Sequence, residues 1–126
     1  MKTTNYRDTL ITASPDTPVT ASVTPEKPDS VAGAQHALVA GRPYVLTSDD
    51  LLHAAHVARS LSPPRATFFA KPQACLRVSP LVKQFGWGIH HDAEGRIALV
   101  GMESDDYARL LADPAVKKTP GMRRSR

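Results

Sequence analysis

Hydrophobic and polar residues alternate most regularly in the C-terminal half of the chain, where they predict a β-hairpin. Its two strands, residues 87–91 and 96–102, flank Asp92-Ala93-Glu94-Gly95, which has the form of a type I turn with glycine in the left-handed position. Pairing Asp92 with Arg96 fixes the register, because side chains alternate between the two faces of a strand. The predicted core face carries Trp87, Ile89 and His91, the last at its rim, opposite Gly101, Leu99 and Ile97.

The other face of the predicted hairpin carries His90 opposite Ala98, and Gly88 opposite Val100. Since Gly88 leaves bare backbone beside His90, a shallow hollow around this histidine is one interpretation. An exposed histidine on a strand face is the alternative.

Capping residues and helical spacing predict several short helices. Ser48 is a suitable N-cap for a helix through residues 51–61, because Asp49-Asp50 suits a positive helix start. Ser79-Pro80 predicts the start of another helix, with Gly86 after its end. Shorter helices are predicted at 32–40, where a strand fits nearly as well, at 64–69 and at 107–111, and extended segments at 5–12 and 42–46.

Strands interleaved with short helices indicate the α+β class, with a small antiparallel sheet that has the helices packed on one side. Residues 1–113 are expected to form one domain. Within it, residues 13–33 are rich in Pro, Thr and Ser and predict a long loop. Residues 114–126 predict a disordered basic tail. The hairpin leaves sheet edges, so pairing of two chains into a homodimer stays open.

Composition restricts the class of protein. The chain has 126 residues, of which 41% are hydrophobic and 22% charged, enough for a modest core. No apolar run approaches the roughly 18 residues that span a bilayer, and the N-terminus lacks the apolar segment of a secretory signal. A single Cys forms no internal disulfide, so the default location is cytoplasmic and no membrane partner is expected.

The net charge of +4 comes from the C-terminal tail. Removing the five basic residues of the tail from the total of 16 leaves 11, against 12 acidic residues. Clustered positive charge displaces counterions from phosphates, so nucleic-acid contact is one function for the tail, and a solvated chain end is the simpler alternative. The five residues are Lys117, Lys118, Arg123, Arg124 and Arg126.

Cys75 is the only soft nucleophile of the chain. A catalytic thiol needs a cation, a histidine or a helix N-terminus to lower its pKa, and the candidates are Arg77 in the sequence and His90 through the fold. A buried structural cysteine is the alternative, since Ala74-Cys75-Leu76 is an apolar setting. The sequence therefore leaves open whether the protein is an enzyme.

No metal or cofactor site is expected. Asp49, His53 and His56 share one side of a predicted helix, but this side is opposite its apolar residues, where solvent should be, and no fourth ligand is evident. The sequence has neither a phosphate-binding glycine loop nor a Gly-x-Ser-x-Gly nucleophile elbow.

Rare residue types form a recognisable block between residues 68 and 90. The block consists of Phe68-Phe69, Lys71, Gln73 to Arg77, Ser79-Pro80-Leu81, Lys83, Gly86 to Gly88 and His90. Together with Asn5-Tyr6, Asp8-Thr9 and residues 47–50, it resembles a small bacterial and fungal family known only as a domain of unknown function. Pro72 stands where the family pattern has Gly. The resemblance implies no activity, but it favours Cys75 and His90 as functional residues over His53, His56 and His91.

The sequence favours a non-catalytic module that binds a small anionic ligand or a protein partner. Arg77 and Lys83 are expected to hold the anionic group by charge-assisted hydrogen bonds. The predicted pocket consists of Gln73, Cys75, Arg77, Lys83, Trp87 and His90. The alternatives are an enzyme with Cys75 as nucleophile and His90 as base, and nucleic-acid contact through the basic tail.

Overall fold

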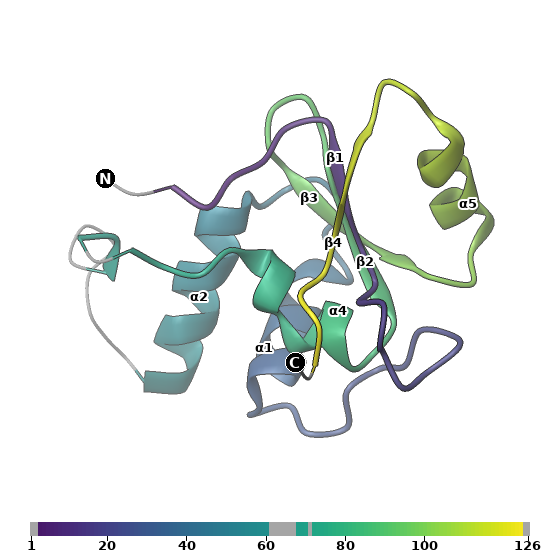
Figure 1. Ribbon diagram of the computed structural model, residues 1–126. Helices are drawn as coiled ribbons and strands as arrows, with labels where there is room; N and C mark the ends of the chain where they lie inside the picture. Colours follow the sequence, from purple (N-terminus) through teal and green to yellow (C-terminus); the bar gives the residue numbers. More distant parts are fainter. Residues whose placement is uncertain (1–2, 61–67, 71, 125–126) are drawn as a thin grey trace.

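The computed structural model describes residues 3–60, 68–70 and 72–124, and its centre is a four-stranded sheet (Figure 1). The strands are β1 (Thr9–Thr12), β2 (Trp87–His91), β3 (Ile97–Gly101) and β4 (Lys117–Pro120), in the order β3-β2-β1-β4. The helices are α1 (Val31–Val39), α2 (Ser48–Ser60), the 3-10 turn η1 (Leu76–Val78), α4 (Pro80–Lys83) and α5 (Asp105–Ala112). The predicted α+β class is confirmed, and the helix predicted at 64–69 lies mostly outside the described residues.

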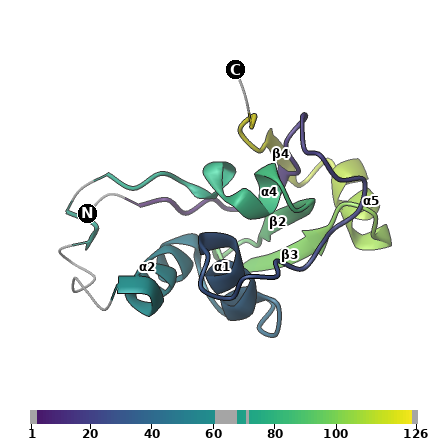
Figure 2. The ribbon, with the colours of Figure 1, turned by 90° about the horizontal axis from the view of Figure 1, so that it is seen from below.

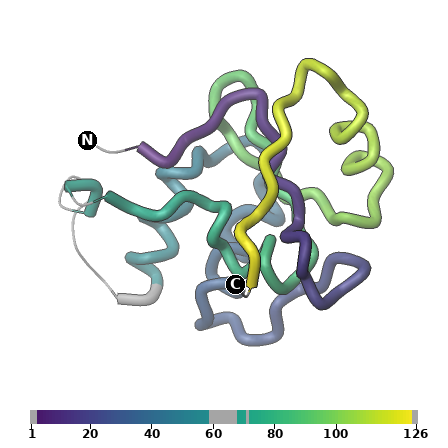
Figure 3. The backbone as a smooth tube through the Cα atoms, in the orientation of Figure 1, coloured from purple at the N-terminus to yellow at the C-terminus, as the bar shows by residue number. Residues whose placement is uncertain are grey.

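The sheet is mixed, where the sequence predicted an antiparallel one. β2 pairs antiparallel with both β1 and β3, whereas β4 pairs parallel with β1. Figure 3 shows the yellow C-terminal segment running beside the purple N-terminal segment. Hydrophobic patterning could not reveal this pairing, because every residue of β4 is exposed or half-buried.

Residues 117–124 belong to the folded domain, which corrects the prediction of a disordered tail at 114–126. The Lys117 N–H donates to the Asp8 carbonyl over 2.7 Å, and the Gly121 N–H donates to the Thr12 carbonyl over 2.8 Å. Gly121 is buried so closely against Ser14 that a Cβ there would lie 2.8 Å from Ser14 Oγ. The edge of β1 thus gains its hydrogen bonds from a strongly basic segment.

Alternation along the strands separates two hydrophobic clusters on opposite faces of the sheet. The larger cluster contains Ile11, Val39, Leu51, Leu76, Val82, Ile89 and Ile97, so α1, α2, η1 and α4 pack on this face. The smaller cluster contains Leu10, Val100, Tyr107 and Leu110, so α5 packs on the other face. Figures 1 and 2 show α5 apart from the group formed by α1, α2 and α4. Within the described residues, no helix is long and apolar enough to cross a membrane.

The register predicted for the hairpin is confirmed along its whole length, and Gly95 has a φ of +82°, as the turn requires. His91 is fully buried instead of lying at a rim. The space beside Gly88, which was interpreted as part of a shallow hollow around His90, is filled, because a Cβ there would lie 2.7 Å from Cε2 of Tyr107. α5 therefore covers the face that the sequence left open.

The residue that caps α2 is Thr47, one position before the predicted N-cap Ser48. Thr47 Oγ1 accepts from the Asp50 N–H, and Asp50 Oδ2 accepts from the Thr47 N–H, both over 3.1 Å. This is a reciprocal capping box. Ser48 is instead buried, with its Oγ 2.8 Å from Thr4 Oγ1. Residues 42–46, predicted as extended, form a turn in which Tyr44 has a φ of +60°.

Ser79 caps α4 as predicted, and Ser30 caps α1. Ser30 Oγ accepts from the Gly33 N–H over 3.0 Å, and Ser79 Oγ accepts from the Leu81 N–H over 3.1 Å. The Ser79 hydroxyl also donates to Gln35 Oε1 of α1 over 2.5 Å in the interior. This hydrogen bond connects the N-terminal start of α4 to α1 and so fixes its position.

The Pro-rich loop spans residues 13–30 and is attached to the protein at defined points. The Val23 N–H donates to the Phe85 carbonyl, and Trp87 Nε1–H donates to the Val23 carbonyl, both over 2.9 Å. Near its end the loop crosses α1 so closely that a Cβ at Gly33 would lie 2.0 Å from the Lys27 carbonyl oxygen. Backbone contacts of this kind hold the loop in place, although it forms no helix or strand.

Candidate functional site

A groove of about 570 Å³ lies where η1, α4 and the C-terminal segment meet. Its lining residues are Pro15, Arg77, Val78, Lys83, Pro120, Gly121, Met122, Arg123 and Arg124. Four of these nine residues are Arg or Lys, and they come from three separate parts of the chain. We call this region the basic groove.

Arg77 joins η1 to the C-terminal segment. Its Nε–H donates to the Pro120 carbonyl over 2.7 Å, and its own carbonyl accepts from the Met122 N–H over 2.8 Å. A guanidinium has five N–H donors, and the contact with Pro120 occupies one of them. The backbone contact therefore orients Arg77 and leaves most of its donor capacity for the groove.

The segment after β4 is held by two further hydrogen bonds. Ser14 Oγ–H donates to the Met122 carbonyl over 2.5 Å, and the Arg124 N–H donates to Asp16 Oδ1 over 2.8 Å. Both partners belong to the start of the Pro-rich loop. They fix the backbone from which the Arg123 and Arg124 side chains extend.

Lys83 enters the groove from the last turn of α4. Leu81 and Val82 of the same helix are fully buried, which leaves Lys83 on the outer side of α4. Ser79 at the helix start is tied to α1. The position of the Lys83 backbone is therefore set by the core.

The charges of the basic groove are not balanced within it. Its described lining contains no acidic residue, although Asp16 contacts the backbone beside it. Arg96 with Glu94 and Arg109 with Asp106 form ion pairs elsewhere, and among the described residues no ion pair involves the four groove cations. Like charges held together repel one another, and a bound anion relieves this repulsion. The groove therefore has the electrostatics of an anion site.

Only two of the six residues predicted to form a pocket, Arg77 and Lys83, lie together in the basic groove. Arg123 and Arg124 join them, although the sequence placed these two in a separate tail. The density of basic residues near the C-terminus was the available signal. The pairing of β4 with β1, which carries them to the groove, has no local signal.

Cys75 precedes η1 and contacts Tyr6. Cys75 Sγ and Tyr6 Oη are 3.2 Å apart. Burial, together with this hydrogen bond, raises the pKa of Tyr6 to about 12, so the phenol is neutral at physiological pH. The half-buried thiol therefore has a hydroxyl group as its neighbour and not a base.

Gln73 and Trp87 have structural contacts outside the basic groove. Gln73 Nε2–H donates to the Phe68 carbonyl over 2.8 Å. Trp87 Nε1–H holds the Pro-rich loop at Val23, and the indole ring lies 5.4 Å from the ring of His36. Neither residue lines the groove.

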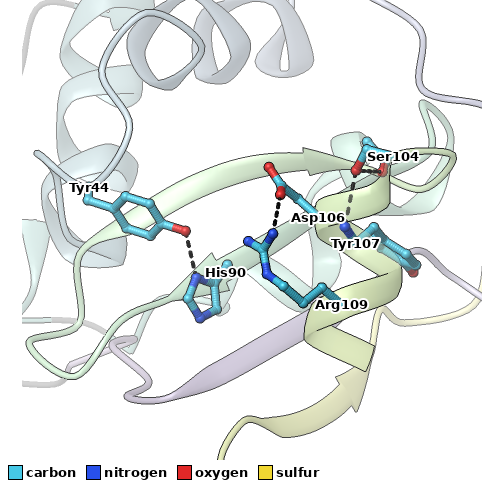
Figure 4. Close-up of polar contacts among 7 residues, drawn as sticks. Tyr44, His90, Ser104, Asp106, Tyr107 and Arg109 are labelled. Carbon is cyan, nitrogen blue, oxygen red and sulfur yellow. Dashed lines mark hydrogen bonds and ion pairs between the residues drawn. The ribbon is translucent and has the colours of Figure 1, made fainter. Parts of the chain in front are cut away.

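His90 lies on the opposite face of the sheet from Cys75. It is paired with Leu10, which belongs to the smaller cluster, whereas Tyr6 packs against the larger one. His90 Nδ1 is instead 2.7 Å from Tyr44 Oη (Figure 4). Burial lowers the pKa of His90, so its ring is neutral at pH 7. The predicted pairing of Cys75 with His90, and the six-residue pocket that included both, do not form.

The helix residues considered as metal ligands have other roles. Asp49, expected on a solvated face, is only 2% exposed and accepts from the Thr4 N–H and Thr4 Oγ1–H, both over 2.7 Å. The rings of His53 and His56 lie 5.6 Å and 4.8 Å from that of Phe68. Among the described residues, no three His, Cys, Asp or Glu side chains are placed to hold a metal ion.

The fold and the site define a small α+β protein with a basic groove beside its C-terminal strand. The chain belongs to a family of unknown function, DUF6157, whose model matches residues 1–126. The resemblance to a domain of unknown function is thereby confirmed. No curated protein and no solved structure matches the chain.

Proposed function

We propose that the protein binds an anionic ligand in the basic groove. The observation that carries this proposal is the convergence of Arg77, Lys83, Arg123 and Arg124 on one groove without an acidic lining residue among those described. Arginine favours carboxylate and phosphate groups because its planar fork binds two oxygens at once. The proposed function is therefore binding, with the charged end of the ligand between the arginines.

The size and the lining of the basic groove favour an organic anion over a bare ion. Its volume of about 570 Å³ lies within the range of roughly 300–1,000 Å³ that is usual for small-molecule sites. Pro15, Val78 and Met122 contribute apolar surface beside the cations. A ligand with a phosphate or carboxylate group and an apolar body satisfies both parts of this lining.

Nucleic acid is the second candidate, because Lys117 and Lys118 of β4 extend the positive surface beyond the groove and are exposed. A chain of phosphates needs several such contacts, and its binding weakens steeply with salt. The second candidate therefore differs from the first in its salt dependence as well as in the residues it requires.

Calorimetric titration with phenyl phosphate, inorganic phosphate and a short single-stranded DNA separates these cases. We expect phenyl phosphate to bind more tightly than inorganic phosphate, because only the former covers the apolar lining. The variant Arg123→Gln/Arg124→Gln removes two charges and keeps the backbone contacts of the segment. This variant should weaken the binding of phenyl phosphate by at least about tenfold, since a hydrogen bond to a charged group contributes about 1.5–3 kcal/mol.

The matched control is Arg7→Gln/Arg42→Gln, which removes two exposed arginines outside the groove. It has the same net charge as the groove variant and should bind phenyl phosphate like the unmodified protein. Equal weakening by both variants would assign the effect to net charge. The proposed site fails if none of the three probes binds, or if the groove variant binds phenyl phosphate as tightly as the control.

A further inference from the structure

The two edges of the sheet differ in how they are protected. β4 forms one edge, and there Pro120 lacks an N–H while its carbonyl accepts from Arg77 Nε–H. Lys118 also lies on this edge strand and is exposed. Proline and lysine are residues that commonly block the addition of another strand. β3 forms the other edge and has neither residue.

The backbone of Leu99 faces the free side of β3. Ile97 N–H donates to the Leu46 carbonyl and the Ile97 carbonyl accepts from the Tyr44 N–H, both over 2.8 Å, so Ile97 faces away from β2. Backbone groups two residues apart in a strand point to the same side. Leu99 N–H and C=O therefore point outward as well, and they have no hydrogen-bond partner among the described residues.

A pocket of about 260 Å³ adjoins this part of β3. Pro43 and Tyr44 form one wall, and Ser104 and Asp106 at the start of α5, with Arg109 from its last turn, form the other. Figure 4 shows Tyr44 on one side of His90 and the ion pair of Arg109 and Asp106 on the other, all on the face of the hairpin that α5 covers. We call this region the edge pocket. Its floor is β3 itself, with Leu99 in the middle.

The Tyr44 wall is fixed by contacts rather than by packing alone. Tyr44 has the left-handed φ of +60°, which residues other than glycine adopt rarely and often at functional sites. The bond from its N–H to Ile97 holds its backbone, and His90 Nδ1 holds its hydroxyl at 2.7 Å. Burial raises the pKa of Tyr44 and lowers that of His90, so both are neutral at pH 7 and are joined by a hydrogen bond between uncharged groups.

We infer that the edge pocket docks a short extended peptide, which adds to β3 through the backbone of Leu99. An outward N–H and C=O on one strand residue are complementary to another extended backbone. The edge already accepts a segment in this way, since Thr47 pairs with Arg96 in an antiparallel bridge. Arg109 and Asp106, whose side chains are 72% and 65% exposed, offer opposite charges to the side chains of the peptide.

A peptide suits this edge better than a second copy of the chain. The turn at Tyr44 and the start of α5 stand at the two ends of the open stretch, which leaves room for about three extended residues at 3.3 Å each. A second β3 carries the same two walls, so the walls of two paired copies collide. A free peptide has no such obstruction.

Amide hydrogen exchange tests the open edge in the full-length chain. The Leu99 amide should exchange at least about 100-fold faster than those of Ala98 and Val100, whose N–H groups face β2. Equal protection of the three amides would show that Leu99 already has a partner, and would overturn the inference before any ligand is added.

Titration with acetyl-Val-Thr-Val-amide, followed by NMR of the labelled protein, tests the docking itself. Shifts are expected at Leu99, Gly101 and Tyr44, with slower exchange of the Leu99 amide at millimolar peptide. Successive N–H groups of a strand point to opposite sides. Two analogues, one N-methylated at the central residue and the other at the last residue, should therefore differ in affinity. Only one of them should bind more weakly than the parent peptide, by about fivefold or more.

The variant Arg123→Gln/Arg124→Gln serves as the control, because it alters the basic groove and leaves the edge pocket unchanged. It should bind the peptide like the unmodified protein, so the two proposals fail independently. Shifts that map outside the edge pocket, or equal binding of both N-methylated analogues and the parent peptide, would contradict strand addition.

Discussion

Among the described elements, α1, α2, α4 and η1 cover the face of the sheet that carries Ile89 and His91, whereas α5 covers the face that carries His90 and Val100. Among the described residues, the cluster on the larger face has seven buried hydrophobic residues and the cluster on the smaller face has four, so the two faces differ in how much core they provide. The adjacent histidines show the consequence. His91 is 0% exposed, while His90 is partly exposed and bonded to Tyr44.

Because of this difference, we expect the two faces of the sheet to have different roles, one in stability and one in exposing polar groups. The larger face excludes water from its side chains and is expected to determine the stability of the fold. The smaller face leaves polar groups such as His90 and Arg109 within reach of solvent. Both proposed sites lie at the borders of the sheet, the basic groove beside β4 and the edge pocket beside β3.

The same substitution on each face tests this division. Leu51 of α2 is 0% exposed in the larger cluster, and Leu110 of α5 is 9% exposed in the smaller one. Truncating a buried leucine removes its transfer energy and leaves a cavity, so Leu51→Ala should cost about 4 kcal/mol of unfolding free energy. Leu110→Ala should cost about 2 kcal/mol, because the rim of the smaller cluster can collapse or hydrate.

Urea denaturation followed by circular dichroism measures both costs. The two variants carry the same chemical change within a helix, so helix propensity cancels in the comparison. A cost for Leu110→Ala equal to that for Leu51→Ala would show that the two faces contribute equally to stability, which would contradict their different roles.

The elements that the sequence predicted well are those that depend on near neighbours. The hairpin register followed from Asp92 to Gly95, because the turn type fixes the pairing. The helix start at Ser79 followed from a side chain that bonds to the backbone two residues further on. The N-cap of α2 is Thr47 and not the predicted Ser48, one residue away, and it also acts through a local side-chain hydrogen bond.

The elements that the sequence missed depend on contacts between distant segments. β4 pairs with β1 from the other end of the chain, and its alternation is hidden by exposed lysines. α5 was expected as a helix, but nothing local places Tyr107 against Gly88. Contacts between distant segments also decide which residues of the predicted site lie together. Arg77 and Lys83 line the same groove, whereas Cys75 and His90 lie on opposite faces of the sheet.

His91 should make the protein sensitive to acid. Neither of its ring nitrogens has a hydrogen-bond partner among the described residues, and burial lowers its pKa to about 4 from 6.5. The backbone of Ile89 and Thr9 opposes this shift, but too weakly to reverse it. Between these two values the unfolded chain binds a proton that the folded protein does not. Stability therefore falls as the pH drops from 6.5 to 4, by about 3 kcal/mol.

Unfolding free energies at pH 7 and pH 4 measure this effect. His91→Leu removes the titrating group and should reduce the loss on acidification by most of that amount. His90→Gln is the matched control on the smaller face and should leave most of the loss in place, because His90 is only partly buried. If both variants lose stability as steeply as the unmodified protein, groups other than His91 cause the acid sensitivity.

Gly88 tests how tightly α5 closes the smaller face. A Cβ at this position would lie 2.7 Å from Cε2 of Tyr107 and 3.2 Å from the Ile11 carbonyl oxygen, so Gly88→Ala forces the ring or the strand to move. Overpacking of this kind costs about 1–3 kcal/mol. Gly41→Ala is the control, because a Cβ there meets nothing within 4 Å and its cost should be close to zero. Thermal unfolding of both variants compares them. Equal melting temperatures would mean that Tyr107 moves aside freely and that α5 is only loosely attached to the sheet.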